Sequence, residues 1–363
     1  RRDLLVVSSE VDDPPNGVRA TISIFQRTKD AARQTDLMSD PADPSGWSAM
    51  SGMVASPDEA NLLYAVNDSF YAQSQIFTID TSTAPAKVTD ALSITVDDQP
   101  VGYDPEGIAL TNEGGFWIAS EGSVSGSLAM RPNLLIKVGA NGEVIEEIGL
   151  PEAVVACREQ TVAGADPDND DEVAFARALR FGFEGVTVDQ HGMVRVAQQR
   201  GWHYTPGLVV ETSAGPVNCD DIGDADGHTA VWTYDPSTGD WSSTPYELAP
   251  TPETASWVGL SEIVALDDGT FLLIERDNRT GDSAGLKTVV KTAIGESVTA
   301  DDKAVVDLIG PMQADNGWIS DKPEGLAVTA DGLVWMITDN DGVDDWNGET
   351  QLLNLGKTGA LFG

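Results

Sequence analysis

One short unit recurs five times along the chain, and this repeat constrains the fold more than any other feature of the sequence. Each copy is an apolar segment, a turn rich in Gly, Asp and Asn, and a second apolar segment. The clearest copies are DPEGIALTNEGGFWIASEG, GFEGVTVDQHGMVRVAQQRG and KPEGLAVTADGLVWMITDND, which begin at Asp104, Gly182 and Lys322. Weaker copies begin at Ser51 and Gly259. Short apolar segments joined by such turns are typical of paired β-strands.

The spacing of the copies indicates how many strands each unit holds. Counted between equivalent positions, successive copies lie 55, 78, 77 and 63 residues apart. Further strand-like segments follow the pairs, such as QIFTID at Gln75, NLLIKV at Asn133 and EVIEEIGL at Glu143. Four antiparallel strands repeated at this interval are typical of a β-propeller. We therefore predict an all-β fold of four-stranded antiparallel blades.

The two ends of the chain are expected to complete a sixth blade. The segments DLLVVSSEVDD, from Asp3, and RATISIFQRT, from Arg19, fit the second and third strands of a unit. The segment KTGALFG, from Lys357, would supply its first strand. A ring joined in this way has no open sheet edge. The prediction is a single six-bladed domain over residues 1–363, with its ring closed by both termini.

Two acidic stretches interrupt the repeat, at about 151–173 and 203–227. Both are rich in Gly, Pro and Asp, and we expect loops there, either binding loops or tolerated insertions. Each stretch contains one of the two cysteines, Cys157 and Cys219. The cysteines could form a disulfide that joins the two loops or remain free thiols, and the sequence leaves both alternatives open.

The charge of the chain excludes some classes of partner. There are 59 Asp and Glu residues against 21 Lys and Arg residues, which gives a net charge of −38 at pH 7. Such a surface repels nucleic acid and anionic lipid and favours cations. No run of about 18 apolar residues is present, so no membrane span is expected. The acidity favours a secreted or periplasmic protein, which we expect to be a monomer.

Two positions in each unit place acidic side chains on one face of the predicted propeller. The first strand of a blade lines the axis and the second returns beside it, so the start of one and the end of the other share a face. Glu106, Glu184 and Glu324 precede the repeat glycines at the start of the first strand. The full set predicted on this face, including the ends of second strands, is Glu10, Asp68, Glu106, Glu121, Glu184, Glu275, Glu324 and Asp339.

Many carboxylates around one axis repel each other unless a cation or bound protons offset their charge. Oxygen ligands in flexible loops suit Ca²⁺, which accepts roughly six to eight oxygens, better than Mg²⁺, which keeps more of its own water. We therefore predict that this set holds Ca²⁺, with Mg²⁺ as the less suitable ion. The structural alternative is that each Glu of a Glu-Gly pair caps backbone amides while the Gly permits a close turn.

At these motifs the chain resembles the phytase-like propeller family, also described by esterase-like activity of phytase. The resemblance lies in DPEGIAL with FWIASEG, in FGFEGVTV, in WVGLSEIVALDDGTFLLIERDN and in KPEGLAVTADGLVWMITDND, and it spans roughly Ser51 to Leu355. It implies phosphoesterase-type activity carried by repeated acids, which map onto Glu106, Glu121, Glu184, Glu324 and Asp339. The chain departs from a complete acidic ring at Gln199 and Ser51, where an acid is expected.

Individual residues can be given roles in the phosphoesterase activity that the resemblance implies. Glu106 and Glu184 are the predicted catalytic residues, with Glu184 as a metal ligand or a general base. Arg276, Arg200 and Lys322 lie at the same strand ends and are predicted to bind the substrate's phosphate charge, the alternative being that each pairs with a neighbouring acid. The expected function is a Ca²⁺-dependent phosphoesterase that acts on a small-molecule phosphate ester.

Two other functions remain open, because a fold does not fix an activity. One is a Ca²⁺-dependent lactonase or carboxyl esterase, since other six-bladed propellers also hold a metal in the axial channel. The other is a secreted Ca²⁺-binding propeller that recognises a partner and catalyses nothing. Whether the chain is an enzyme at all is therefore left to experiment.

Overall fold

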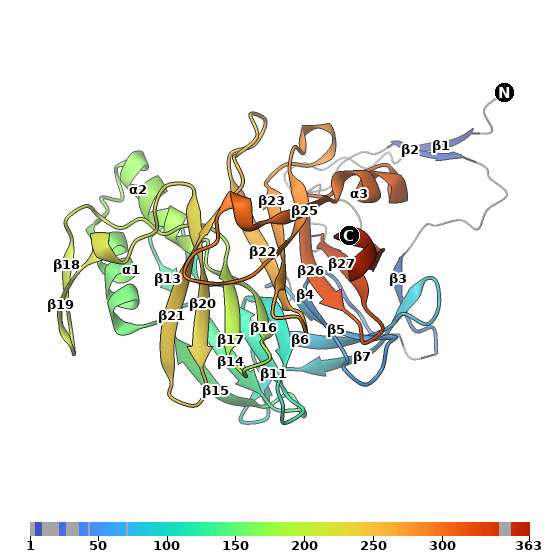
Figure 1. Ribbon diagram of the computed structural model, residues 1–363, viewed down its shortest axis with the longest axis horizontal. Helices are drawn as coiled ribbons and strands as arrows, with labels where there is room; N and C mark the ends of the chain where they lie inside the picture. The colour runs from blue at the N-terminus through green and yellow to red at the C-terminus, as the bar shows by residue number, and fades with distance from the viewer. Residues whose placement is uncertain (1–3, 9–21, 27–35, 43, 70–71, 341–349) are drawn as a thin grey trace.

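Five β-sheets arranged as the blades of a propeller form the body of the protein (Figure 1). The computed structural model describes residues 4–8, 22–26, 36–42, 44–69, 72–340 and 350–363. The sequence copies of the repeat correspond one by one to the two inner strands of these sheets. The all-β propeller predicted from the repeat is therefore confirmed.

Each blade begins with an innermost strand beside the axis, and the later strands follow outward in chain order. Blade 1 consists of β4 (Met50–Ala55), β5 (Leu62–Asn67), β6 (Gln75–Asp80) and β7 (Ala86–Ser93). Blade 2 consists of β10 (Pro105–Leu110), β11 (Phe116–Ser120), β14 (Leu134–Val138) and β15 (Val144–Gly149). Blade 3 consists of β16 (Phe183–Val188), β17 (Val194–Gln198), β20 (His228–Asp235) and β21 (Asp240–Glu247).

The last two blades follow the same plan. Blade 4 consists of β22 (Val258–Ala265), β23 (Phe271–Asp277), β24 (Lys287–Thr292) and β25 (Ala304–Asp307). Blade 5 consists of β26 (Lys322–Val328), β27 (Leu333–Asp339) and β28 (Leu352–Lys357). Four antiparallel strands per blade are thus found in blades 1 to 4, whereas blade 5 has three described strands.

The prediction of six blades is wrong, because the described residues form five. The innermost strands β4, β10, β16, β22 and β26 contact one another in this order, and β26 also contacts β4. A Cβ atom on Gly325 of β26 would lie 2.5 Å from the backbone oxygen of Ser51 in β4. Backbones this close leave no space for another innermost strand between the first and last blades.

The segments assigned to the sixth blade lie elsewhere. The strands β1 (Leu4–Ser8) and β2 (Ile22–Gln26) pair only with each other among the described residues. The strand β3 (Leu37–Ser39) instead joins the outer edge of blade 1, parallel to β7. The C-terminal segment continues from β28 into the short helix α4 (Thr358–Leu361). Within the described residues neither end supplies an innermost strand, so closure of the ring by both termini is not found there.

The inner strands are buried because neighbouring blades cover both of their faces. All five residues of β11 are buried, and so are the first five of the six residues of β10. The outermost strand β15 has no fully buried residue. Near-continuous apolar segments therefore mark the inner strands, whereas a mixed pattern marks an edge that faces water.

A β-bulge interrupts the first strand of every blade at the position that precedes the repeat glycine. The strand register shifts between Pro105 and Gly107, and equivalent shifts occur in the other four blades. A bulge turns the side chain of its extra residue away from the regular alternation of a strand. The five residues at these bulges are Ser51, Glu106, Glu184, Ser261 and Glu324.

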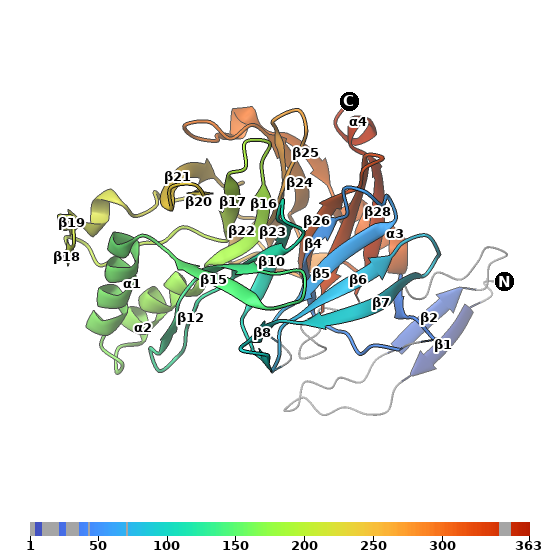
Figure 2. The ribbon, with the colours of Figure 1, turned by 90° about the horizontal axis from the view of Figure 1, so that it is seen from below.

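The two acidic insertions were predicted to be loops, and they contain regular structure as well. The first forms α1 (Glu152–Gly164) and α2 (Asp170–Arg177), and the second contains the hairpin of β18 (Val209–Thr212) and β19 (Gly215–Asn218). These elements lie together at one side of the propeller (Figure 2). The cysteines form the disulfide Cys157–Cys219, which settles the alternative that the sequence left open.

The described part of the chain contains no helix that is both long and apolar enough to cross a membrane.

Candidate functional site

Six carboxyl groups meet at one end of the propeller axis, and we call this group the axial cluster. Its members are Asp68, Asp104, Glu106, Glu121, Glu184 and Glu324. The carboxylate oxygens that Asp68, Asp104 and Glu106 present lie within 4.8 Å of one another. The sequence analysis predicted five of the six, and the structure brings these five together.

Strand geometry explains why these residues converge. Glu106, Glu184 and Glu324 occupy the bulges at the starts of innermost strands, so they reach the axis from three blades. Asp68 follows the end of β5 and Glu121 follows the end of β11, the second strands of two blades. The backbone N–H of Glu121 donates to the carbonyl oxygen of Asp104 at 2.8 Å, which fixes the two strand ends side by side.

Asp104 is a member of the cluster that the sequence analysis missed. It stands directly before β10 and therefore at the same end of the blade as Glu106. The rule that first-strand starts and second-strand ends share a face also covers the residue before the strand. Applied one residue earlier, that rule would have included Asp104.

Burial and mutual repulsion favour the protonated forms of these acids. Burial raises the pKa of Glu106 well above its usual value, and the charges of Asp68, Glu184 and Glu324 raise it further. Burial likewise raises the pKa of Glu184, with added repulsion from Glu121 and Glu324. Such shifts arise where like charges lie close together away from water. The carboxylates that act on one another in this way come from several blades and lie near the same end of the axis.

The pKa values of two further members are raised into the physiological range. Burial raises the pKa of Asp104 to about 6, and the charge of Asp68 contributes. Burial also raises the pKa of Glu121 to about 8, together with the charge of Asp104. Carboxyl groups with pKa values near neutrality can both accept and release protons at physiological pH.

The two positions that depart from an acidic ring are occupied by donors to the remaining acids. The hydroxyl group of Ser51 donates to Oε2 of Glu106 at 2.7 Å. The side-chain amide of Gln199 donates to Oε1 of Glu184 at 2.5 Å. Their hydrogen bonds fix the orientation of the carboxylates that they contact, without adding a further negative charge.

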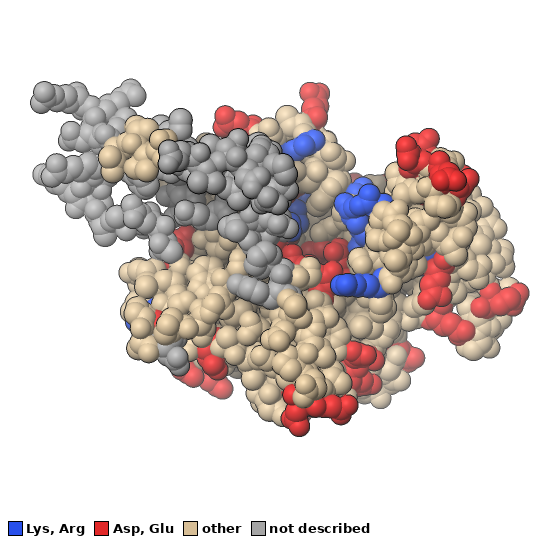
Figure 3. Space-filling model, turned by 180° about the vertical axis from the view of Figure 1, so that it is seen from behind, with Lys and Arg blue, Asp and Glu red and all other residues tan. Residues whose placement is uncertain are grey.

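Two cationic side chains lie among the carboxylates. A guanidinium nitrogen of Arg276 is 2.6 Å from Oε1 of Glu324, and both side chains are buried. The ammonium group of Lys322 lies 3.2 Å from Asp339 and 3.8 Å from Asp68. Burial opposes the charge of Arg276, but the neighbouring carboxylates raise its pKa above the usual value. On the face seen in Figure 3, acidic and basic side chains likewise lie side by side in a central hollow.

Two of the other predicted metal ligands, Glu275 and Asp339, are paired with basic side chains. Glu275 accepts hydrogen bonds from Tyr246 at 2.6 Å and Lys303 at 2.7 Å. The carboxylate of Glu275 is therefore held by Tyr246 of blade 3 and by Lys303, which directly precedes β25 of blade 4. Asp339 forms an ion pair with Lys322 at the edge of the cluster. Glu10 lies outside the described residues.

The side chain of Glu262 crosses the axis, and the sequence analysis assigned it no role. It stands where β4, β10, β16 and β26 have glycine, and it is fully buried. Its carboxylate accepts backbone hydrogen bonds from Ile263 at 2.9 Å and Met53 at 3.2 Å. A Cβ atom on Gly185 would lie 2.0 Å from Oε1 of Glu262. The carboxylate thus occupies space that the glycine of another blade leaves open, and burial raises its pKa well above the usual value.

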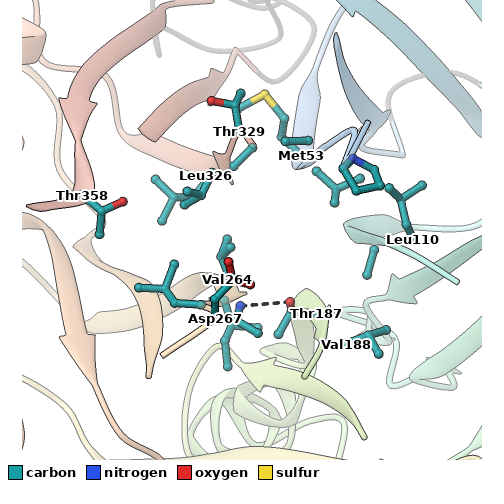
Figure 4. A pocket seen from close by; sticks show the side chains of 18 of the residues that line it. Met53, Leu110, Thr187, Val188, Val264, Asp267, Leu326, Thr329 and Thr358 are labelled. Atoms are coloured by element: carbon teal, nitrogen blue, oxygen red, sulfur yellow. Dashed lines mark hydrogen bonds between the residues drawn. The ribbon is translucent and has the colours of Figure 1, made fainter. Parts of the chain in front are cut away.

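The opposite ends of the same strands enclose a cavity of about 780 Å³. Side chains from all five blades surround this opening, as Figure 4 shows. Its walls combine apolar side chains, such as Met53, Leu110 and Val264, with polar ones, such as Thr187 and Asp267. The cavity does not include any residue of the axial cluster. The cavity and the cluster therefore lie at different ends of the axis.

The donor set of the axial cluster fits a calcium ion. Two oxygens that bind one Ca²⁺ at about 2.3–2.6 Å lie at most about 5 Å apart, and the three grouped acids satisfy this limit. Oε2 of Glu184 is buried and has no hydrogen-bond partner among the described residues. An unpaired buried acceptor beside other carboxylates is the kind of atom that a hard cation would satisfy.

The family model named Phytase-like, described as "Esterase-like activity of phytase", matches residues 45–342. The chain belongs to the Phytase-like family. The match to this family runs from the residues before β4 to the end of β27, so it contains all five innermost strands and the whole axial cluster. None of the curated proteins compared with the sequence matches it.

Solved structures similar to this Phytase-like chain include a periplasmic gluconolactonase of Pseudomonas aeruginosa, with 12% identity and a TM-score of 0.39 over 98% of this chain and 97% of that one. A gluconolactonase of Xanthomonas campestris has 12% identity and a TM-score of 0.39 over 86% and 76% of the two chains. A PQQ-bound aldose sugar dehydrogenase of Streptomyces coelicolor has 14% identity and a TM-score of 0.39 over 85% and 94%.

Proposed function

We propose that the protein is a Ca²⁺-dependent phosphoesterase whose reaction takes place at the axial cluster. The observation that carries the proposal is the grouping of three carboxylates whose oxygens lie within 4.8 Å of one another, with Lys322 beside one of them and Arg276 on the neighbouring Glu324. Membership of the Phytase-like family supports an esterase-type reaction. A phosphate ester is the substrate class that combines a need for a cation with a need for basic side chains.

Asp68, Asp104 and Glu106 are the residues that would hold the metal, because their oxygens already lie within one coordination sphere. Bound Ca²⁺ would offset the negative charge of the phosphate oxygens and lower the pKa of a coordinated water. The hydrogen bond from Ser51 keeps Oε2 of Glu106 in place, so this ligand needs little rearrangement. The site is therefore largely formed before any cation arrives.

Glu184 is suited to transfer a proton during the reaction. Its Oε1 atom is held by Gln199, which leaves Oε2 as the atom without a hydrogen-bond partner in the described part of the chain. A bound cation would favour the ionised form of Glu184, and a buried carboxylate of raised pKa then accepts a proton from an attacking water more readily than an exposed one. Glu184 is the general base in this proposal.

Arg276 and Lys322 supply positive charge beside the reacting group. Arg276 is fixed by Glu324, and this buried pair also prevents the guanidinium from leaving the site. Lys322 is held between Asp68 and Asp339. Their charges would stabilise the negative charge that accumulates on the phosphate oxygens in the transition state.

The proposal is tested by measuring hydrolysis of phosphomonoesters, phosphodiesters, lactones and carboxyl esters. The protein is first freed of metal by chelation and dialysis, and Ca²⁺ is then returned. We expect phosphate-ester turnover only with Ca²⁺, and a loss of about 100-fold or more in Glu106→Gln. The matched control is Glu113→Gln, which removes an exposed carboxylate from the turn between β10 and β11 at the other end of the axis.

The same panel separates the alternatives. Lactone or carboxyl-ester turnover with no phosphate-ester turnover would replace the phosphoesterase with a lactonase or esterase. A thermal unfolding temperature that rises with Ca²⁺ while every substrate stays intact would reject catalysis and favour a Ca²⁺-binding propeller.

A further inference from the structure

Two arginines lie stacked on aromatic rings next to the axial cluster, and we call Arg180, Phe181, Arg200 and Trp257 the arginine ladder. The guanidinium of Arg180 lies 4.6 Å from the ring centre of Phe181, and that of Arg200 lies 4.4 Å from the same ring. Arg200 is also 5.5 Å from the ring of Trp257. The two rings are themselves 5.4 Å apart. The four side chains thus form one continuous stack.

Neither arginine of the ladder forms an ion pair with an acid. In a chain with 59 acidic and 21 basic residues, most cations can find a carboxylate. Within the described residues, the guanidinium groups of Arg180 and Arg200 form no hydrogen bond and no ion pair with protein atoms. Burial and the charge of Arg177 lower the pKa of Arg180, which the more distant charge of Glu121 opposes, and burial and the charge of Arg180 lower the pKa of Arg200. Two like charges held together without a directly bonded counter-charge indicate that an anion from outside completes the group.

The aromatic rings explain how the arginines can be fixed without a carboxylate. A guanidinium that lies over a ring is held by its flat face, while the N–H groups around its edge stay available. Two N–H groups on one edge match the oxygens of a phosphate or carboxylate. The ladder therefore orients donors in advance and leaves their anion-binding edges free.

The ladder also lies beside the proposed reaction centre. The backbone N–H of Gly182, next to Phe181, donates to Oε1 of Glu121 at 3.0 Å. Arg276, which pairs with Glu324, lies 5.3 Å from the ring of Trp257 at the far end of the stack. The ladder is thus connected to two acids of the axial cluster. A molecule of modest size could contact both regions at once.

We propose that Arg180 and Arg200 form a second anion subsite, which binds a phosphate or carboxylate group of the substrate other than the one that reacts. The proposal rests on the proposed function for the identity of the reacting group. It adds that the preferred substrate carries at least two anionic groups. It also assigns binding to Arg180, which no sequence motif indicated.

Direct binding tests the subsite without any turnover. Metal-free dialysed protein is titrated with inorganic phosphate and, separately, with succinate by calorimetry. Because the carboxylates of the axial cluster repel anions when no metal is bound, the ladder is the expected binding site. We expect Arg200→Gln and Arg180→Gln each to weaken binding by about 10-fold, since each loses charged hydrogen bonds.

Two control variants distinguish the subsite from a general effect of charge. Lys137→Gln makes the same charge change in β14, where Lys137 pairs with Glu113 away from the ladder, and its binding should equal that of the wild type. Arg200→Lys keeps the charge but loses the planar fork, and it should recover only part of the affinity. No binding of either anion to the wild type, or equal binding by all variants, would overturn the proposal.

Kinetics with matched substrates complete the test. Butyl phosphate, butane-1,4-diol bisphosphate and 4-phosphooxybutyrate differ only in the second anionic group. With Ca²⁺ present, Arg200→Gln should raise KM about 10-fold for one or both of the two-anion substrates, and less than about 2-fold for butyl phosphate. The substrate that is affected identifies the second group as phosphate or carboxylate.

The failure of the subsite can be told apart from the failure of the proposed function. If no substrate is cleaved but anion binding still depends on Arg180 and Arg200, the subsite stands and the phosphoesterase is rejected. If all three substrates are cleaved and the variants change neither KM nor anion binding, the subsite is rejected and the phosphoesterase stands.

Discussion

At one end of the five innermost strands, buried carboxylates surround the axis, whereas at the other end the same strands enclose a cavity with both apolar and polar walls. In β16, for example, Glu184 reaches the axial cluster and Val188 lines the cavity four residues later. The backbone also differs, because each strand has its β-bulge only at the acidic end. The bulge re-aims a side chain that regular alternation would direct between blades. Chemistry is thus concentrated where the backbone departs from a regular strand.

The side chain of Glu262 lies between the end of the axis that carries the axial cluster and the end that encloses the cavity. Its carboxylate accepts hydrogen bonds from the backbone of Met53 and Ile263 and lies beside the glycine of β16. Each other blade has glycine at this level, so only blade 4 provides a side chain that can fill the axis. The irregular repeat of blade 4 thus divides an axial channel that five repeats with glycine at this position would leave continuous.

The largest expected effect is a loss of turnover, which we test with one variant at each end of β16. Glu184→Gln should lower kcat about 100-fold to 1,000-fold, because the amide cannot accept the proton. Thr187→Val, three residues along the same strand, should keep kcat within about 2-fold. Steady-state kinetics with Ca²⁺ on the best phosphate ester measures both. Equal losses in the two variants would show that the acidic end has no special role.

The next effect concerns the residue that divides the axis. Glu262→Ala leaves two buried N–H groups without acceptors and creates a void, so we expect a loss of about 2–3 kcal/mol in the free energy of unfolding. Glu262→Gln keeps an acceptor oxygen and should lose less. Urea unfolding followed by circular dichroism gives both values. A gain in stability for Glu262→Ala would mean that repulsion from Glu324 outweighs the hydrogen bonds.

The carboxyl groups of the axial cluster should make the stability of the metal-free protein depend on pH. Asp104 and Glu121 have pKa values raised to about 6 and about 8, so the folded protein keeps protons that the unfolded chain has already lost. Stability of the metal-free protein should therefore fall as pH rises from about 4 to about 8, by several kcal/mol, because each tenfold change in proton affinity corresponds to about 1.4 kcal/mol.

Calcium should reverse this trend. Its binding requires the same protons to leave, so its affinity should rise over the same pH interval. Urea unfolding at several pH values, with and without Ca²⁺, measures both effects. A metal-free stability that stays constant from pH 4 to pH 8 would contradict the proposed repulsion.

The smallest effect is expected at the cavity end. The backbone N–H of Ala265 donates to the hydroxyl of Thr187 at 3.0 Å, which joins blades 3 and 4. Thr187→Val removes this acceptor and should lower the free energy of unfolding by about 1 kcal/mol. Thr187→Ser keeps the hydroxyl and serves as the control. If Thr187→Val is as stable as the wild type, this hydrogen bond does not stabilise the contact between blades 3 and 4.

Much of the fold follows from the repeat, and the wrong prediction of six blades has a physical cause. The inner strands and the convergence of Glu106, Glu184 and Glu324 follow from strand alternation and blade symmetry. The number of blades does not, because segments such as residues 3–13 carry a strand pattern that is compatible with several sheet edges. Five blades result from the direct packing of β26 on β4, a contact between distant segments.

The amino-acid sequence already specifies the repeated strand pair, the glycines that allow close strand approach, and the end of each blade that carries the acids. These are local properties, because a strand's period and its turn residues fix where side chains point. Long-range packing, by contrast, pairs Glu275 with Lys303, sets Glu262 across the axis, and brings Arg180 and Arg200 to the ring of Phe181. Each of these contacts joins side chains from different parts of the fold, and their distances follow from packing rather than from spacing along the chain.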